Sequence, residues 1–185
     1  AEGFVVVQIV TDSSVLYTEE EAKAAGFDVV PLCVSVGDMD GRDLQINMEE
    51  FYGRIGKGEI PRSSQPPIGD VVEVYEKYQD ADVLNICVAD GLSGTYHGAL
   101  SARDMVESRD RITVFNSRTL CGPHRYMVEK AQKMKEEGKG IPEILEWLKS
   151  AAEKTESFLI PQDFGFLKRG GRLTPVAAAL GSVLK

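Results

Sequence analysis

The sequence predicts an α/β protein in which a parallel sheet is covered by helices on both faces. Short runs rich in Val and Ile alternate with segments of helical periodicity along most of the 185 residues. The strand-like runs are short and apolar, which is typical of buried parallel strands. The loops between strands and helices are short, and a strand–helix alternation of this kind predicts parallel strands joined by helical crossovers.

Five segments have the composition of strands. The second of them contains Pro31, which favours an edge or irregular position because proline cannot donate to a sheet ladder. Glycine and aspartate over residues 37–41 predict a turn at the end of the second segment. The expected strands cover residues 4–10, 28–36, 82–88, 111–115 and 157–161.

The helices are predicted from caps and periodicity. Thr18 and Glu21 form a capping-box pattern, and Gly26 is placed to end that helix. Asn47 can cap the second helix, and Pro67 can begin the third. The expected helices cover residues 18–26, 47–55, 66–78, 96–107, 122–137, 142–154, 163–172 and 175–185.

Composition excludes several classes of protein. The net charge of −8 argues against a general nucleic-acid surface and against an anionic membrane surface. The chain has no run of about 18 apolar residues, so we expect no membrane span. Three cysteines lie far apart without a metal-binding spacing, which favours reduced thiols over a disulfide framework or a zinc site. Since no signal peptide is evident at residue 1, these features indicate a cytoplasmic protein.

The character of the sequence changes near residue 157. We therefore expect an N-terminal α/β domain over residues 1–156 and the start of a second α+β domain over residues 157–185. The last predicted helix is apolar and lacks a glycine stop, so it needs a partner to cover it. We expect the chain to be a fragment whose second domain is truncated, although a docked terminal helix is the alternative.

The loop after the third predicted strand is the first candidate site. It contains Gly91, Ser93, Gly94 and Thr95. In an open parallel sheet, ligands bind outside the carboxyl ends of the strands. Glycines there allow a close approach of the backbone, and the next helix offers unpaired N–H groups to an anion. The alternative interpretation is an ordinary helix cap with a glycine turn.

The same loop invites a hydrolase hypothesis, which the residues support poorly. A nucleophile elbow needs G-x-S-x-G, and Thr95 occupies the position of its last glycine. A catalytic serine also needs a histidine within reach. Only His97 and His124 are available, and we expect His97 to be a surface or helix-packing residue.

Three further segments carry polar side chains. Residues 62–67 offer two hydroxyls and an amide before a helix, although for this segment alone helix capping by Ser64 is the favoured interpretation. Asp12 follows the first strand and could be a metal ligand or acid–base group, but capping and turn formation are favoured. Residues 168–172 hold three cations that could bind phosphate or an acidic partner, whereas a solvated charged run is the default.

Five motifs, taken together and in this order, resemble the DegV family of bacterial fatty-acid-binding proteins. Each motif is weak alone, but their order and approximate spacing agree with that family. The resemblance covers the whole chain, and family members normally extend further. The motifs are Val10-Thr11-Asp12-Ser13-Ser14, Arg62-Ser63-Ser64-Gln65-Pro66 in place of T-S-Q-P, Leu92-Ser93-Gly94-Thr95-Tyr96, Phe115-Asn116-Ser117-Arg118 and Leu167-Lys168-Arg169-Gly170-Gly171-Arg172-Leu173.

The resemblance implies a two-domain α/β fold with a long-chain fatty acid between the domains and no other cofactor. Hydroxyls from two loops then hold the fatty-acid carboxylate. They correspond to Ser63, where serine replaces the usual threonine, and to Ser93 with Gly94 and Thr95. A histidine of the second domain contributes in the family, and neither His97 nor His124 matches it. The site in this chain is therefore expected to be incomplete.

The resemblance also implies a partner. Some family members are the lipid-presenting subunit of a fatty acid kinase, in which a separate subunit phosphorylates the bound carboxylate for phospholipid synthesis. On this interpretation the protein is not itself an enzyme, and Lys168, Arg169 and Arg172 could help to dock the kinase. Two alternatives remain open. One is a hydrolase or phosphate-ester enzyme that uses the Gly91–Thr95 loop, and the other is a protein-interaction module.

Overall fold

The computed structural model describes residues 5–173. Its main sheet contains four parallel strands in the order β2-β1-β6-β7, which confirms the predicted fold class. β1 therefore lies between β2 and β6 at the centre of the sheet. The strands of the main sheet are β1 (Val7–Asp12), β2 (Asp28–Val30), β6 (Asp82–Cys87) and β7 (Ile112–Asn116).

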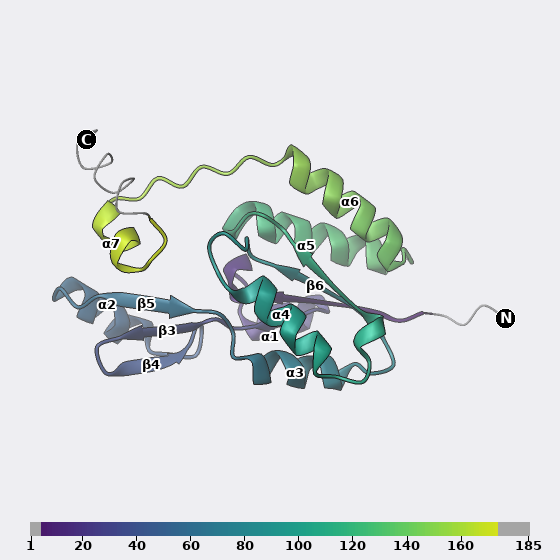
Figure 1. Cartoon of the computed structure of the whole chain (residues 1–185), viewed down its shortest axis with the longest axis horizontal. Helices are drawn as coiled ribbons and strands as arrows, with labels where there is room; N and C mark the ends of the chain where they lie inside the picture. Colours follow the sequence, from purple (N-terminus) through teal and green to yellow (C-terminus); the bar gives the residue numbers. More distant parts are fainter. Residues whose placement is uncertain (1–4, 174–185) are drawn as a thin grey trace.

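Helices cover both faces of the main sheet, as the sequence predicts (Figure 1). On one face α1, α5 and α6 pack on a core that includes Ile9, Leu84 and Met127. On the other face α3 and α4 pack around Val10 and Tyr75. These helices are α1 (Glu19–Ala25), α3 (Ile68–Lys77), α4 (Thr95–Asp104), α5 (Cys121–Glu136) and α6 (Ile141–Lys154).

A second, antiparallel sheet was missed by the sequence analysis. The segment 28–36, predicted as one strand, is two strands that belong to different sheets, because Pro31 and Leu32 interrupt the pairing. Its second half pairs with residues expected to be a turn and with residues expected to be a loop. This small sheet, in the order β4-β3-β5, consists of β3 (Cys33–Val36), β4 (Met39–Arg42) and β5 (Pro61–Ser64).

The small sheet lies beyond the carboxyl ends of the main strands (Figure 1). α2 (Met48–Gly56) connects β4 to β5, and Asn47 caps it as predicted by accepting a hydrogen bond from the Glu50 backbone N–H. β5 then runs back toward the main sheet and leads into α3. The carboxyl edge of the main sheet, where open α/β sheets generally bind ligands, therefore faces the small sheet.

The predicted end of the first strand was wrong. β1 continues through Thr11 and Asp12, which had been assigned to a turn, because both residues pair with β2. A short 3₁₀ turn, η1 (Ser13–Val15), comes next, and a second one, η2 (Arg109–Arg111), precedes β7. The capping box of α1 is confirmed, with Thr18 and Glu21 bonded reciprocally.

The predicted strand over residues 157–161 is also wrong. These residues are extended but unpaired, and Phe158 and Ile160 are 85% and 89% exposed. An extended segment becomes a strand only when a neighbouring strand takes up its backbone hydrogen bonds. The segment leads to α7 (Phe164–Arg169), whose predicted N-cap Asp163 accepts from the Gly165 backbone N–H. The helix predicted over 175–185 lies outside the described residues.

Candidate functional site

Ser63, the first predicted site residue, lies at the end of β5. Pairing with β3 sets Ser63 opposite Val34, and the Ser63 side chain is exposed. The sequence suggested a loop here because Pro61 and Pro66 flank a polar run. An edge strand tolerates a proline at its first position, and Pro61 begins β5.

The second group of predicted residues lies at the start of α4. Gly94 is the N-cap, and no side chain caps the helix there. The first N–H groups of an uncapped helix are free to bind an anion, and the helix dipole favours negative charge at this end. Ser93 is half-buried beside this end of α4, and Thr95 is buried.

Ser93 and Thr95 form a hydroxyl pair. Their Oγ and Oγ1 atoms are 2.7 Å apart, and the Thr95 backbone N–H also donates to Ser93 Oγ at 3.3 Å. Only one of the two hydroxyl hydrogens is used in the bond between them. The other hydrogen is free for an external acceptor. Either hydroxyl can be the donor in this bond, and where Thr95 donates, the O–H of the less buried Ser93 is left without an acceptor in the pair.

Gln65 brings the two predicted segments together. The Gln65 side chain lies so close to the α4 N-terminus that a Cβ added at Gly94 would overlap with Gln65 Oε1. At Gly98, one turn further along the helix, an added Cβ would lie 3.2 Å from Gln65 Nε2. A side chain at Gly94 or Gly98 would therefore shift the Gln65 side chain from its place between the end of β5 and the start of α4.

Arg172, in the basic segment 168–172, contacts both of these segments. Its Nε donates to the Leu92 carbonyl oxygen at 3.3 Å, and its Nη2 donates to the Ser63 carbonyl oxygen at 3.2 Å. Lys168 and Arg169, the other two predicted docking residues, are exposed on α7. Contacts of Gln65 and Arg172 thus join the second, third and fifth motifs directly, although these motifs are far apart in the sequence.

The first motif is structural, as the capping interpretation predicted. Asp12 is buried, and its two carboxylate oxygens accept from the backbone N–H groups of Ser14 and Val88. It therefore ties the carboxyl ends of β1 and β6 together. Over residues 5–173, no cluster of three or more His, Cys, Asp or Glu side chains could hold a metal ion.

The fourth motif shapes the same edge. Asn116 accepts from the backbone N–H groups of Asp90 and Arg118 at its side-chain oxygen. A hydrogen bond from the Asn116 side chain also lowers the pKa of the Asp90 carboxyl. The Asp90 carboxylate therefore lies beside Asn116, the last residue of β7.

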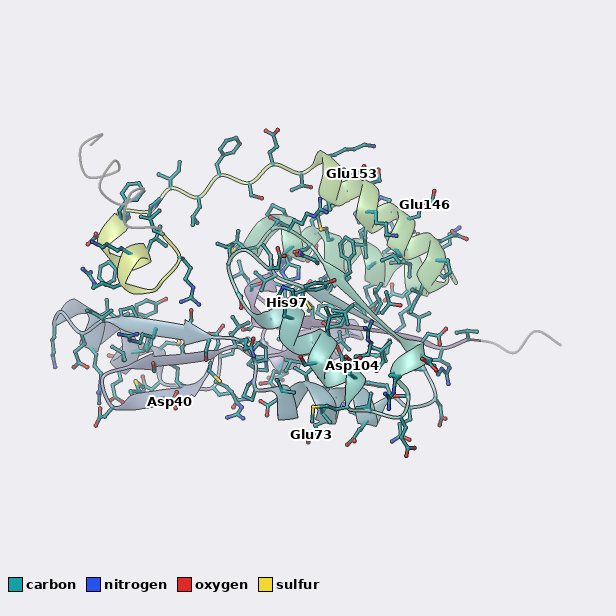
Figure 2. All side chains as sticks on the ribbon, viewed as in Figure 1. Asp40, Glu73, His97, Asp104, Glu146 and Glu153 are labelled. Atoms are coloured by element: carbon teal, nitrogen blue, oxygen red, sulfur yellow. The ribbon has the colours of Figure 1, made fainter. Side chains whose placement is uncertain are left out.

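The two histidines do not serve Ser93. His97, labelled in Figure 2, is exposed on α4 and packs edge-on against Tyr96. His124 is fully buried, with Nδ1 2.7 Å from Ser14 Oγ and Nε2 3.0 Å from the Ile86 carbonyl oxygen. A carbonyl oxygen only accepts, so Nε2 carries the hydrogen and Nδ1 accepts from Ser14. Sequence reasoning missed this pair, because residues 110 positions apart gave no local signal.

Comparison with known proteins identifies the family. Residues 6–185 match the family model described as "Uncharacterised protein, DegV family". The chain belongs to the DegV family. A DegV domain-containing protein of Halalkalibacterium halodurans is 33% identical over 184 residues, which cover 97% of this chain and 65% of that protein. The chain thus spans about 65% of the length of this DegV relative.

Solved structures of DegV proteins have the same fold. A DegV protein of Thermus thermophilus, described by its fatty acid binding, has 30% identity and a TM-score of 0.81, with 98% of this chain and 65% of that one covered. DegV of Bacillus subtilis, a fatty acid binding protein, has 29% identity and a TM-score of 0.83, with coverage of 96% and 64%. A DegV protein of Eubacterium eligens loaded with heptadecanoic acid has 26% identity and a TM-score of 0.81, with coverage of 97% and 65%.

Within residues 5–173, none of the helices has both the length and the apolar character that a membrane crossing requires. The three thiols, Cys33, Cys87 and Cys121, are all free in the structure.

Proposed function

We propose that this DegV protein binds a long-chain fatty acid and holds its carboxylate at the carboxyl edge of the main sheet. The proposed carboxylate ligands are the hydroxyls of Ser63 and Ser93, and Gly94 and Thr95 complete the proposed site at the α4 N-terminus. The observation that carries the proposal is the free hydroxyl hydrogen of the Ser93–Thr95 pair, which lies beside an uncapped helix end. A carboxylate is an acceptor-only group, so it matches both features.

The descriptions of the DegV relatives support this ligand class. The Thermus and Bacillus proteins are described by fatty acid binding, and the Eubacterium eligens protein was loaded with heptadecanoic acid. An acyl chain contributes about 0.8 kcal/mol for each buried CH₂, so most of the affinity comes from the chain. The polar cluster sets the orientation of the head group, which is the usual division in small-molecule sites.

Binding of oleate to the full-length protein tests the proposal. Ser93→Ala removes the hydroxyl that is directed to the carboxylate, and we expect the oleate Kd to rise about tenfold, or about 1.4 kcal/mol. Ser63→Ala should weaken binding by a similar factor. Ser101→Ala is the matched control, because the Ser101 hydroxyl donates to the His97 carbonyl oxygen within α4. Oleate affinity that is unchanged in both Ser93→Ala and Ser63→Ala would remove these hydroxyls from the site.

We further propose that the DegV protein works in the bacterial cytoplasm and presents its ligand to a separate fatty acid kinase subunit. The chemistry then resides in the partner, and the role of this protein is to orient the carboxylate. Lys168, Arg169 and Arg172 form the proposed basic docking surface, and the first two project from α7 into solvent. Opposite charges on a partner would steer association and be sensitive to salt.

Charge reversal tests the docking proposal. Lys168→Glu together with Arg169→Glu should reduce capture of the kinase subunit at least tenfold and leave the oleate Kd unchanged. Lys154→Glu, an exposed cation at the end of α6, should affect neither. If the Lys168→Glu/Arg169→Glu variant captured the kinase subunit as well as the wild type, α7 would be excluded from the docking surface.

The hydrolase hypothesis finds no support in the described residues. Ser93 is bonded to Thr95 rather than to a histidine, and the serine–histidine pair that the structure shows joins Ser14 to a fully buried ring. Labelling of Ser93 by a fluorophosphonate probe would revive that alternative.

A further inference from the structure

The C-terminal end of α7 places Arg172 by a defined local motif. The Gly171 N–H donates to the Lys168 carbonyl oxygen at 3.1 Å, and the Arg172 N–H donates to the Leu167 carbonyl oxygen at 2.9 Å. These two bonds are the Schellman arrangement, which requires a left-handed residue at its centre. Gly171 has φ +79°, a conformation that glycine adopts without strain. The Gly170-Gly171 pair therefore turns the chain back at Arg172.

The Arg172 guanidinium then bridges the two segments of the proposed carboxylate site, the end of β5 and the loop before α4. One of its bonds goes to the carbonyl of Ser63 itself, and another goes to the carbonyl of Leu92, the residue before Ser93. A third bond, from Nη1 to the Gly170 carbonyl oxygen at 2.6 Å, fixes the guanidinium to its own turn. A planar group with several donors in a fixed geometry suits such a bridge, whereas an ammonium does not fix direction.

We propose that Arg172 is a positioning residue that sets the spacing between the Ser63 and Ser93 hydroxyls and thereby the affinity for a carboxylate head group. This inference rests on the proposed fatty-acid function and deepens it. All three guanidinium bonds go to neutral carbonyl oxygens. These acceptors do not neutralise the positive charge of Arg172, which therefore favours an anionic ligand at the proposed site. Arg172 acts through the two segments that carry Ser63 and Ser93, and it does not need to contact the ligand itself.

The carboxylate and the acyl chain can be separated by the choice of ligand. Oleate and oleyl alcohol have the same chain, but only oleate has the carboxylate. In the full-length protein, Arg172→Met should raise the oleate Kd about tenfold and change the Kd of oleyl alcohol by less than twofold. Arg172→Lys should recover only part of the oleate affinity, because it restores charge without the two-pronged geometry.

Arg169→Met is the matched control. It removes the same chemical group three residues earlier in the chain. The Arg169 guanidinium lies over the Phe166 ring. Its oleate Kd should equal that of the wild type. With oleate labelled by ¹³C at C1, the carboxyl resonance of the bound ligand should shift in Arg172→Met and stay in place in Arg169→Met.

Each remaining outcome overturns the inference in a recognisable way. One such outcome is that Arg172→Met loses affinity for oleate and oleyl alcohol to the same extent, while the carboxyl resonance stays in place in Arg172→Lys. Arg172 would then be a general structural residue. Unchanged oleate affinity in Arg172→Met would remove its positioning role while leaving the fatty-acid function intact. Failure of the wild type to bind oleate would instead overturn the proposed function together with this inference.

Discussion

The Gln65 side chain lies so close to Gly94 that a Cβ at this position would displace it, where the end of β5 meets the start of α4. The contact joins two sheets of different topology at the carboxyl edge of the main one. It also explains a glycine that has no unusual backbone angle, since Gly94 has φ −71°. The constraint on this position is therefore the approach of a neighbour rather than conformational freedom.

Replacement of Gly94 tests this contact. In Gly94→Ala the new methyl group displaces the Gln65 side chain, which is flexible, so the cost should be at the low end of overpacking, about 1 kcal/mol. The displacement should weaken oleate binding several-fold. Gly91→Ala is the control within the same loop, because nothing lies within 4 Å of a Cβ there. Isothermal titration of both variants measures the difference, and equal affinities would show that the Gln65 contact has no part in ligand binding.

The two histidines should differ sharply in their contribution to stability. His124→Ala leaves a cavity and removes the hydrogen bonds to Ser14 and the Ile86 carbonyl. We expect it to lower the free energy of unfolding by about 2–4 kcal/mol. His97→Ala should change it by less than about 0.5 kcal/mol, because His97 is exposed. Urea denaturation compares the two, and a small effect of His124→Ala would mean that the pair with Ser14 is not maintained in solution.

Tyr75 should make stability fall at alkaline pH. Burial raises the pKa of the Tyr75 phenol well above its ordinary value. Above about pH 10 the unfolded chain loses this proton while the folded protein keeps it. The unfolded state then binds fewer protons, so the free energy of unfolding decreases as pH rises, by up to about 1.4 kcal/mol per pH unit.

The alkaline effect can be assigned by substitution. Tyr75→Phe should flatten the decrease between about pH 10 and 11, although it also removes the bonds to Asn85 and the Ala99 carbonyl. Tyr52→Phe, at a side chain that is 63% exposed, should keep the wild-type slope. Denaturation at several pH values measures both slopes, and a wild-type slope in Tyr75→Phe would assign the effect to other groups.

The three thiols should react in two classes. Burial raises the pKa of the Cys87 thiol well above its ordinary value, and its side chain has no exposed surface. Cys33 and Cys121 are half-buried. Iodoacetamide at about pH 8, near the ordinary pKa of a thiol, should therefore modify Cys33 and Cys121 in the native protein and all three cysteines in urea. Mass spectrometry of the peptides distinguishes them, and rapid native labelling of Cys87 would contradict the packing of β6.

The sequence by itself determined the parallel sheet, its covering helices and most helix boundaries. The apolar runs of β1 and β6 and the capping box at Thr18 depend on residues that are neighbours along the chain. Local hydrogen bonding and side-chain periodicity are therefore enough to fix them. The motif that contains Ser93 was found for the same reason, because a strand, a glycine loop and a helix come one after another.

Only the tertiary structure decided how distant segments meet. The small sheet depends on the pairing of residues 61–64 with 33–36, and strands so short and polar have no distinctive pattern of their own. The contact of Gln65 with Gly94 and the bonds from Arg172 to the Ser63 and Leu92 carbonyls likewise join residues about 30 to 110 positions apart. Such contacts are set by the packing of whole elements, which no local pattern encodes.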